Sequence, residues 1–188
     1  MRINTACRKS AWLSCLLAAA PAAGQETTQA IVIGQTTTIE SQILDETRSI
    51  SIGTPQFYGD GGDSYGVLYV LDAETNFRQT LASTQFLAGP FTQTIPPLIV
   101  VGIGSTDRMR DLTPPSQVRQ EIDVYPTQGG ADRFLRFILE ELEPWVDAHY
   151  RTNGYSALLG HSLSGLFALH ALVTQPESRS CLTSWDAA

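Results

Sequence analysis

Residues Tyr155–Leu172, which read YSALLGHSLSGLFALHAL, carry the pattern that indicates the fold. They begin with the apolar run Ala157–Leu159, which is long enough for a buried strand and too short for a helix. A turn of small residues, Gly160–Gly165, follows it, and the apolar segment Leu166–Leu172 then predicts a buried helix. Strand, sharp turn and helix, with Ser162 inside the turn, is the setting of a nucleophile elbow.

The G-x-S-x-G motif gives this turn a chemical interpretation. A strained turn would lift the Ser162 hydroxyl above the sheet edge, and the N–H of Leu163 at the helix start would stabilise an oxyanion. The fifth motif position holds Ser164, and Gly165 follows it one place later. The alternative is an ordinary strand–helix turn rich in small residues, because the bare motif recurs by chance.

Further strands precede this stretch. Val67–Leu71 and Leu98–Ile103 are continuous apolar runs, as expected of central parallel strands covered on both faces. Thr36–Leu44 and Arg48–Gly53 also have strand character, and the second alternates apolar and polar side chains. Strands that alternate with helical segments predict an α/β fold with a mostly parallel sheet flanked by helices.

Two helices are expected between these strands. Asp132–Tyr150 has apolar residues at helical spacing on one face, and Pro144 should kink it or restart it. Another helix should follow the Val67–Leu71 strand, with Thr75 or Asn76 as its cap.

The site of such a fold lies beyond the carboxyl ends of its strands. The second oxyanion N–H should therefore come from the loop after the Val67–Leu71 strand, at Ala73 or Glu74. The polar segment from Gly104 to Gln128 also begins at a strand end. Composition alone favours a solvated loop with internal ion pairs there.

The N-terminus predicts an export signal at residues 1–24. Arg2, Arg8 and Lys9 precede the apolar segment Ala11–Ala23, which is too short to span a bilayer and ends in small residues. We therefore expect a secreted or periplasmic protein without a membrane anchor, and one partial α/β domain over residues 25–188.

Charge and cysteine content exclude several classes of function. Beyond the signal, nine arginines face nineteen acidic residues, a net charge of −10, which disfavours nucleic acid as a partner. Cys181 is the sole cysteine beyond the signal, so neither an intrachain disulfide nor a cysteine-based metal site is expected there. The histidines at 149, 161 and 170 lack metal-ligand spacing, and we expect no metal or cofactor.

Four stretches, in order along the chain, resemble one family of enzymes. They are Val67–Phe77, Ile99–Ile103 with Thr106–Pro114, Phe137–Asp147, and Leu159–Leu169. They resemble the putative esterase family of α/β hydrolases, which includes enterochelin and salmochelin esterases, S-formylglutathione hydrolase and the mycolyltransferases. The segment from Asp107 to Pro114 is especially similar to the siderophore-esterase branch.

The resemblance implies specific roles. It implies a serine nucleophile at Ser162, oxyanion donors near Ala73 and Leu163, and a small-molecule ester substrate. It also moves the Arg108–Asp111 part of the loop from a solvated loop to the rim of the site. The rim candidates are Arg108, Arg110, Asp111 and His161.

The resemblance also implies an acid and a histidine after the nucleophile, on later loops. We expect both to be absent from this chain, which resembles the N-terminal part of the fold and ends soon after the elbow in an atypical tail at residues 178–188. His149, His161 and His170 are poorly placed to replace the missing base. The Tyr155–Leu159 strand would then be an unpaired sheet edge, in a chain of low stability and weak activity.

Three hypotheses therefore stand. The first is an exported serine esterase that cleaves carboxylic esters through an acyl-enzyme. The second is an acyltransferase of the same fold, which differs in the nucleophile that arrives second. The third is a non-catalytic binding fragment.

Overall fold

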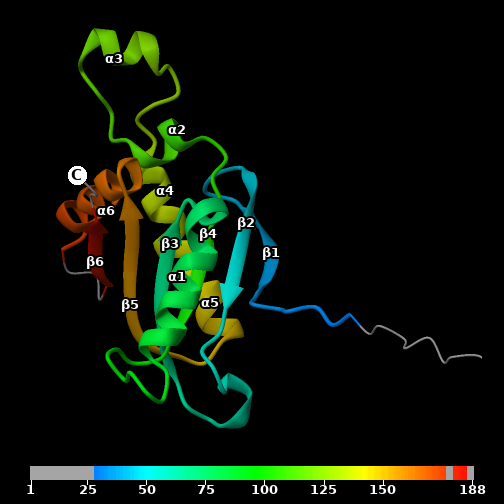
Figure 1. The fold of residues 1–188 in the computed structure, drawn as a ribbon. Helices are drawn as coiled ribbons and strands as arrows, with labels where there is room; N and C mark the ends of the chain where they lie inside the picture. The colour runs from blue at the N-terminus through cyan, green and yellow to red at the C-terminus, as the bar shows by residue number, and fades with distance from the viewer. Residues whose placement is uncertain (1–27, 177–179, 186–188) are drawn as a thin grey trace, which may run out of the picture. The chain divides into compact units, whose positions relative to one another are not determined.

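Six strands form one mixed sheet in residues 28–176 and 180–185, the part of the chain that the computed structural model describes (Figure 1). The strand order is β1-β2-β4-β3-β5-β6, with β1 and β2 antiparallel to their neighbours and the other neighbours parallel. The strands are β1 (Gln35–Ser41), β2 (Glu46–Gly53), β3 (Tyr65–Leu71), β4 (Leu98–Ile103), β5 (Thr152–His161) and β6 (Ser180–Trp185).

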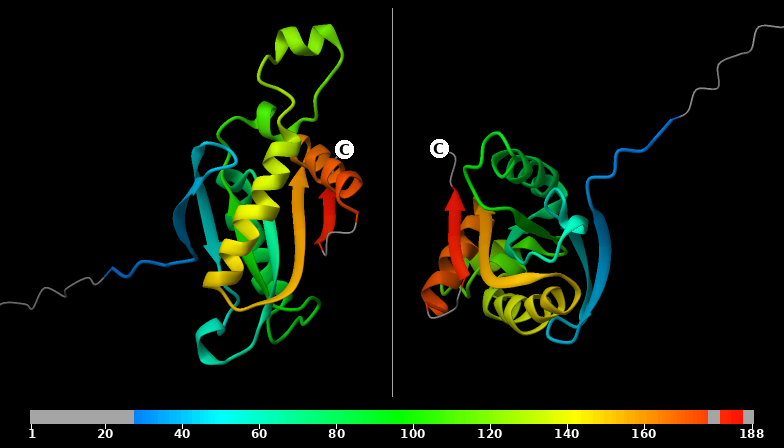
Figure 2. Two further views of the ribbon diagram at one scale, coloured as in Figure 1. Left: turned by 180° about the vertical axis from the view of Figure 1, so that it is seen from behind. Right: turned by 90° about the horizontal axis from the view of Figure 1, so that it is seen from below.

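Helices cover both faces of the sheet. The longest, α1 (Ala73–Leu87), lies on one face, whereas α4, α5 and α6 lie on the other, as Figure 2 shows from behind and from below. The remaining helical elements are η1 (Tyr58–Asp60), α2 (Arg108–Leu112), α3 (Arg119–Val124), α4 (Ala131–Phe137), the π-helical η2 (Ile138–Leu142), α5 (Glu143–His149) and α6 (Leu163–Thr174). None of the described helices is long and apolar enough to cross a membrane.

The two central strands are buried on both sides, as their continuous apolar sequence predicts. On β4, Ile99 and Val101 pack in the core cluster that includes α4 to α6, whereas Val100 packs in the cluster that includes α1. Gly102 allows α1 to come close, since a Cβ there would lie 2.8 Å from a ring carbon of Phe77. The predicted bounds of β4 are confirmed.

The predicted start of one helix and one predicted loop need correction. Helix α1 begins at Ala73, before the predicted caps, because the N–H groups of Thr75 and Asn76 already donate to the Asp72 carbonyl oxygen. The predicted loop from Gly104 to Gln128 contains two short helices, α2 and α3.

The predicted interruption at Pro144 is confirmed, with a different geometry. The helical segment runs through α4, η2 and α5 over residues 131–149, and the π-helical turn of η2 comes directly before the proline region. Proline has no N–H, and its ring collides with the carbonyl group one turn back in a regular α-helix. A widened π turn accommodates such a break without ending the helix.

The prediction that the elbow strand is an unpaired edge is wrong. Strand β6 pairs with β5 in parallel, from Ser156 opposite Ser180 to His161 opposite Trp185. The backbone of Ser180–Trp185, within the predicted atypical tail, thus supplies the missing partner. Residues 177–179 and 186–188 lie outside the described residues, as does the predicted signal at 1–24.

Four charged side chains close a ring beside the carboxyl end of β4. Arg48 of β2 pairs with Glu46 and with Asp111 of α2, and Arg110 pairs with the same two carboxylates. We call Glu46, Arg48, Arg110 and Asp111 the charge quartet. Arg48 is fully buried, donates to the Gly104 carbonyl oxygen at 3.1 Å and lies over the ring of Phe134. The quartet therefore fastens the segment after β4 to β2.

We expect Arg48→Met to lower the free energy of unfolding by about 3–5 kcal/mol, because it leaves buried Asp111 without one of its partners. The measurement is equilibrium urea unfolding. Arg136→Met is the matched control, since Arg136 is exposed and pairs with Glu140 one turn away, so its removal should change stability little. Equal losses in both variants would show that the quartet does not stabilise the fold.

Candidate active site

The backbone of Ser162 is strained at the end of β5. Its φ of 56° and ψ of −117° lie in a region that non-glycine residues rarely occupy, at a cost of about 1–3 kcal/mol. Strand β5 runs through His161 and α6 begins at Leu163, so the turn is a single residue wide. The predicted order of strand, sharp turn and helix around the serine is confirmed.

Small residues make this turn possible. A Cβ on Gly160 would lie 2.2 Å from the carbonyl oxygen of Ser164, a backbone atom that cannot move aside cheaply. The Ser164 hydroxyl accepts from the His161 N–H at 2.8 Å and donates to the His161 carbonyl oxygen at 2.9 Å. The residue that departs from the usual motif therefore bridges the two arms of the turn.

A second helix begins beside the elbow. Strands β3 and β5 are parallel neighbours, with Val70 opposite Leu159, so the start of α1 and the start of α6 lie at the same edge of the sheet. Ala73 and Glu74 are the first residues of α1, and Leu163 is the first of α6. Asp72 precedes α1 and Ser162 precedes α6. In the described structure, neither side chain makes a hydrogen bond that caps its helix. N–H groups in such first turns have no partner within their helix and can bind an anion.

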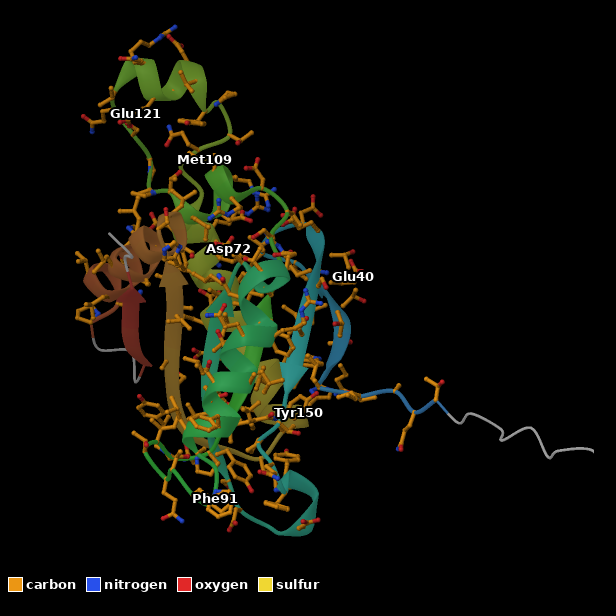
Figure 3. The ribbon with its side chains drawn as sticks, in the orientation of Figure 1. Glu40, Asp72, Phe91, Met109, Glu121 and Tyr150 are labelled. Carbon is orange, nitrogen blue, oxygen red and sulfur yellow. The ribbon has the colours of Figure 1, made fainter. Side chains whose placement is uncertain are left out.

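Asp72 joins β3 to α1 in a left-handed conformation, with φ 54° and ψ 52°. Its carboxylate accepts from Arg108 Nε at 2.7 Å and Nη2 at 2.9 Å, and from the Ser105 hydroxyl at 2.9 Å (Figure 3). Burial alone would raise the pKa of Asp72. The hydrogen bonds from Arg108 and Ser105 and the charge of Arg108 together outweigh burial and hold that pKa below its usual value.

The predicted rim residues divide into two groups. Arg110 and Asp111 belong to the charge quartet, and Asp111 is almost fully buried. Arg108 and His161 are the more accessible members: the Arg108 side chain is 47% exposed, and His161 is exposed next to Ser162. Sequence reasoning overlooked Arg48 and the role of Asp72.

Two histidines have partners away from the serine. His170 Nε2 lies 2.8 Å from an Asp132 carboxylate oxygen. His149 Nδ1 lies 2.7 Å from the Trp145 carbonyl oxygen, and the ring stacks on that of Trp145. Among the described residues there is no cluster of three or more His, Cys, Asp or Glu side chains that could hold a metal ion.

A cleft of about 410 Å³ opens near the elbow, between α6 and the segment that contains α2 and α3. Leu166, one turn after Ser162, forms part of its wall. Figure 3 shows Met109 and Glu121, which also line it, on the side of the sheet where β5 ends. The other lining residues are Thr113, Pro114, Pro115, Ser116, Tyr125 and Gln128.

The mostly parallel sheet, the helices on both faces and the strained serine between β5 and α6 are features of the α/β-hydrolase fold. A family model described as "Putative esterase" matches residues 41–182. The chain belongs to this family.

Two curated relatives are siderophore esterases by name. The ferri-bacillibactin esterase of Bacillus subtilis is 36% identical over 129 residues, which cover 61% of this chain and 44% of that protein. The siderophore enterobactin esterase of Emericella nidulans is 34% identical over 151 residues, which cover 69% of this chain and 49% of that protein. The chain thus spans about half the length of these relatives.

Solved structures agree on the fold. A structure described as an IroE-like serine hydrolase of Shewanella oneidensis is 39% identical with a TM-score of 0.71, and the match covers 79% of this chain and 49% of that one. A siderophore hydrolase of Aspergillus nidulans is 29% identical with a TM-score of 0.67, covering 82% and 59%.

Gly160→Ala should displace the elbow, because the added Cβ meets the Ser164 carbonyl oxygen rather than a flexible side chain. We expect a loss of about 1–3 kcal/mol in unfolding free energy, the typical cost of overpacking. Thermal or urea unfolding would measure it. Gly62→Ala is the control, since a Cβ there meets nothing within 4 Å. If the two variants were equally stable, the close approach at Gly160 would not constrain the turn.

Proposed function

We propose that the chain carries the nucleophile and the oxyanion-binding part of a serine esterase that cleaves carboxylic esters. In this mechanism the Ser162 oxygen attacks the ester carbonyl carbon, the alcohol leaves, and water then hydrolyses the acyl-enzyme. The observation that carries the proposal is the strained Ser162 between β5 and α6, beside the start of α1, which the Asp72 side chain does not cap.

The oxyanion would be held by two helix starts. The Leu163 N–H comes from α6, and the Ala73 or Glu74 N–H comes from α1. Both groups belong to the backbone at the carboxyl edge of the sheet, so they need little reorganisation when negative charge develops on the carbonyl oxygen.

We further propose that the substrate is a small ester of the siderophore type. The names of the two curated relatives support this class. The cleft beside Leu166 supports it too, because its volume of about 410 Å³ lies in the range of small-molecule pockets.

Efficient attack also needs a base near Ser162. His149 and His170 are engaged with Trp145 and Asp132, and adjacent side chains at a strand end, such as those of His161 and Ser162, point to different faces. We therefore propose that the described residues by themselves support only weak turnover. Weak activity is still expected, since oxyanion donors and substrate binding alone leave a reaction rate roughly 10³–10⁴-fold above that in water.

In the purified protein, Ser162→Ala should abolish covalent labelling by a fluorophosphonate probe, since the variant has no hydroxyl at the elbow. Gel fluorescence and intact mass would measure labelling, and hydrolysis of a p-nitrophenyl ester should fall with it. Ser83→Ala is the control, because Ser83 is an exposed serine of α1. Undiminished labelling of the Ser162 variant would remove this residue from the mechanism.

We also propose that residues 1–24 direct export and are then removed, on the evidence of their order of basic, apolar and small residues. Mass spectrometry of protein recovered from outside the cytoplasm should find a new N-terminus near Ala23 or Gln25. Exported protein that still begins at Met1 would refute this proposal.

A further inference from the structure

The carboxylate of Asp72 is turned away from the helix that it precedes. Aspartate before a helix usually accepts from the N–H groups of the first turn. Here the Asp72 side chain makes no cap bond in the described structure, and Arg108 and Ser105 hold both its oxygens. The Asp72 carboxylate thus leaves the N–H groups of Ala73 and Glu74 uncapped, whereas the Thr75 N–H donates to the Asp72 carbonyl oxygen.

A second carboxylate of the same turn is restrained by the same segment. Glu74 Oε1 accepts from the Ser105 N–H at 2.8 Å. The carboxylates of Asp72 and Glu74, which belong to the same turn as the proposed N–H donors of Ala73 and Glu74, are thus both tied to the residues that follow β4. The charge quartet fastens that segment in turn, since Arg110 and Asp111 lie in the helix that Arg108 begins.

A free carboxylate at this position would work against the proposed reaction. It would compete with the substrate oxygen for the N–H group of Glu74, the second helical residue, which an N-cap side chain can reach. It would also repel the negative charge that develops on that oxygen. An arginine that binds a carboxylate through two nitrogens removes both effects, because it fixes the direction of the carboxylate and neutralises its charge.

We propose that Arg108 is a positioning residue that keeps the Asp72 carboxylate off the oxyanion donors at the start of α1. This inference rests on the proposed esterase function. It differs from a role at the substrate rim, because Arg108 acts here through Asp72 and need not touch the substrate.

The kinetic test uses Arg108→Gln, Asp72→Gly and the double variant. Arg108→Gln should lower kcat by about 10–100-fold with little change in KM, since the loss of one oxyanion donor costs about 10²–10³ in kcat. Asp72→Gly should lose less, because glycine accepts the left-handed conformation at no steric cost. The double variant should recover at least about 5-fold over Arg108→Gln, because the released carboxylate is then absent.

The kinetic test has one control variant and two outcomes that would contradict the proposal. Arg119→Gln removes an exposed arginine that pairs with Asp123 on α3, and kcat and KM should stay unchanged. A double variant no better than Arg108→Gln would overturn the proposal, because it would mean that Arg108 merely tethers the loop. A rise in KM at constant kcat, not rescued by Asp72→Gly, would assign Arg108 to substrate binding instead.

A second measurement does not depend on turnover. In Arg108→Gln, the amide NMR signals of Ala73 and Glu74 should shift downfield. The shift should disappear when Asp72 is protonated at low pH. It should also be absent from the double variant. Unshifted amides would overturn the proposal even if kcat fell. If the unaltered protein neither reacted with the fluorophosphonate nor hydrolysed esters, the proposed function would fail, while the amide shifts would still decide the position of the carboxylate.

Discussion

The buried guanidinium of Arg48 is the interaction on which the site end of the molecule depends. A fully buried charge is tolerated only where partners compensate its lost hydration, and Arg48 has two carboxylates, a carbonyl oxygen and an aromatic ring around it. Its Nε has no hydrogen-bond partner in the described structure, so the compensation is incomplete. The arrangement fixes β2, the end of β4 and α2 relative to one another, because it joins them at one point.

Fixing these elements matters because the backbone is strained both at the elbow and at the start of α1. Ser162 and Asp72 have positive φ angles, and neither is glycine. Such conformations persist only where the surroundings over-determine them. At Ser162 the constraint is the hydroxyl of Ser164 bonded to both polar backbone groups of His161. At Asp72 it is the pair of bonds from Arg108, on a helix that the quartet fixes.

Much of this could be predicted from sequence, and the omissions have physical causes. Continuous apolar runs locate β3 and β4, and the small residues around Ser162 locate the elbow. The burial of Arg48 was not predicted. Polar and apolar side chains alternate along β2, and this pattern places Arg48 on the buried face with Ile50 and Ile52. The partner that makes its burial possible is Asp111, 63 residues further on, and such a pairing is a tertiary contact that no local pattern contains.

Local charge balance bears on how an acidic chain could hold an oxyanion at the proposed site. The whole sequence carries a formal charge of −7, which would disfavour an oxyanion if the charge were spread evenly. At the carboxyl edge of the sheet, however, Arg108 offsets Asp72, and the quartet offsets two carboxylates with two guanidinium groups. The Glu74 carboxylate, which accepts from the Ser105 N–H, also lies in the first turn of α1, so the partial positive charges of the first turns of α1 and α6 act beside it. In the proposed mechanism, the arginines of this segment would neutralise nearby carboxylates, and the backbone N–H groups at the two helix starts would meet the substrate.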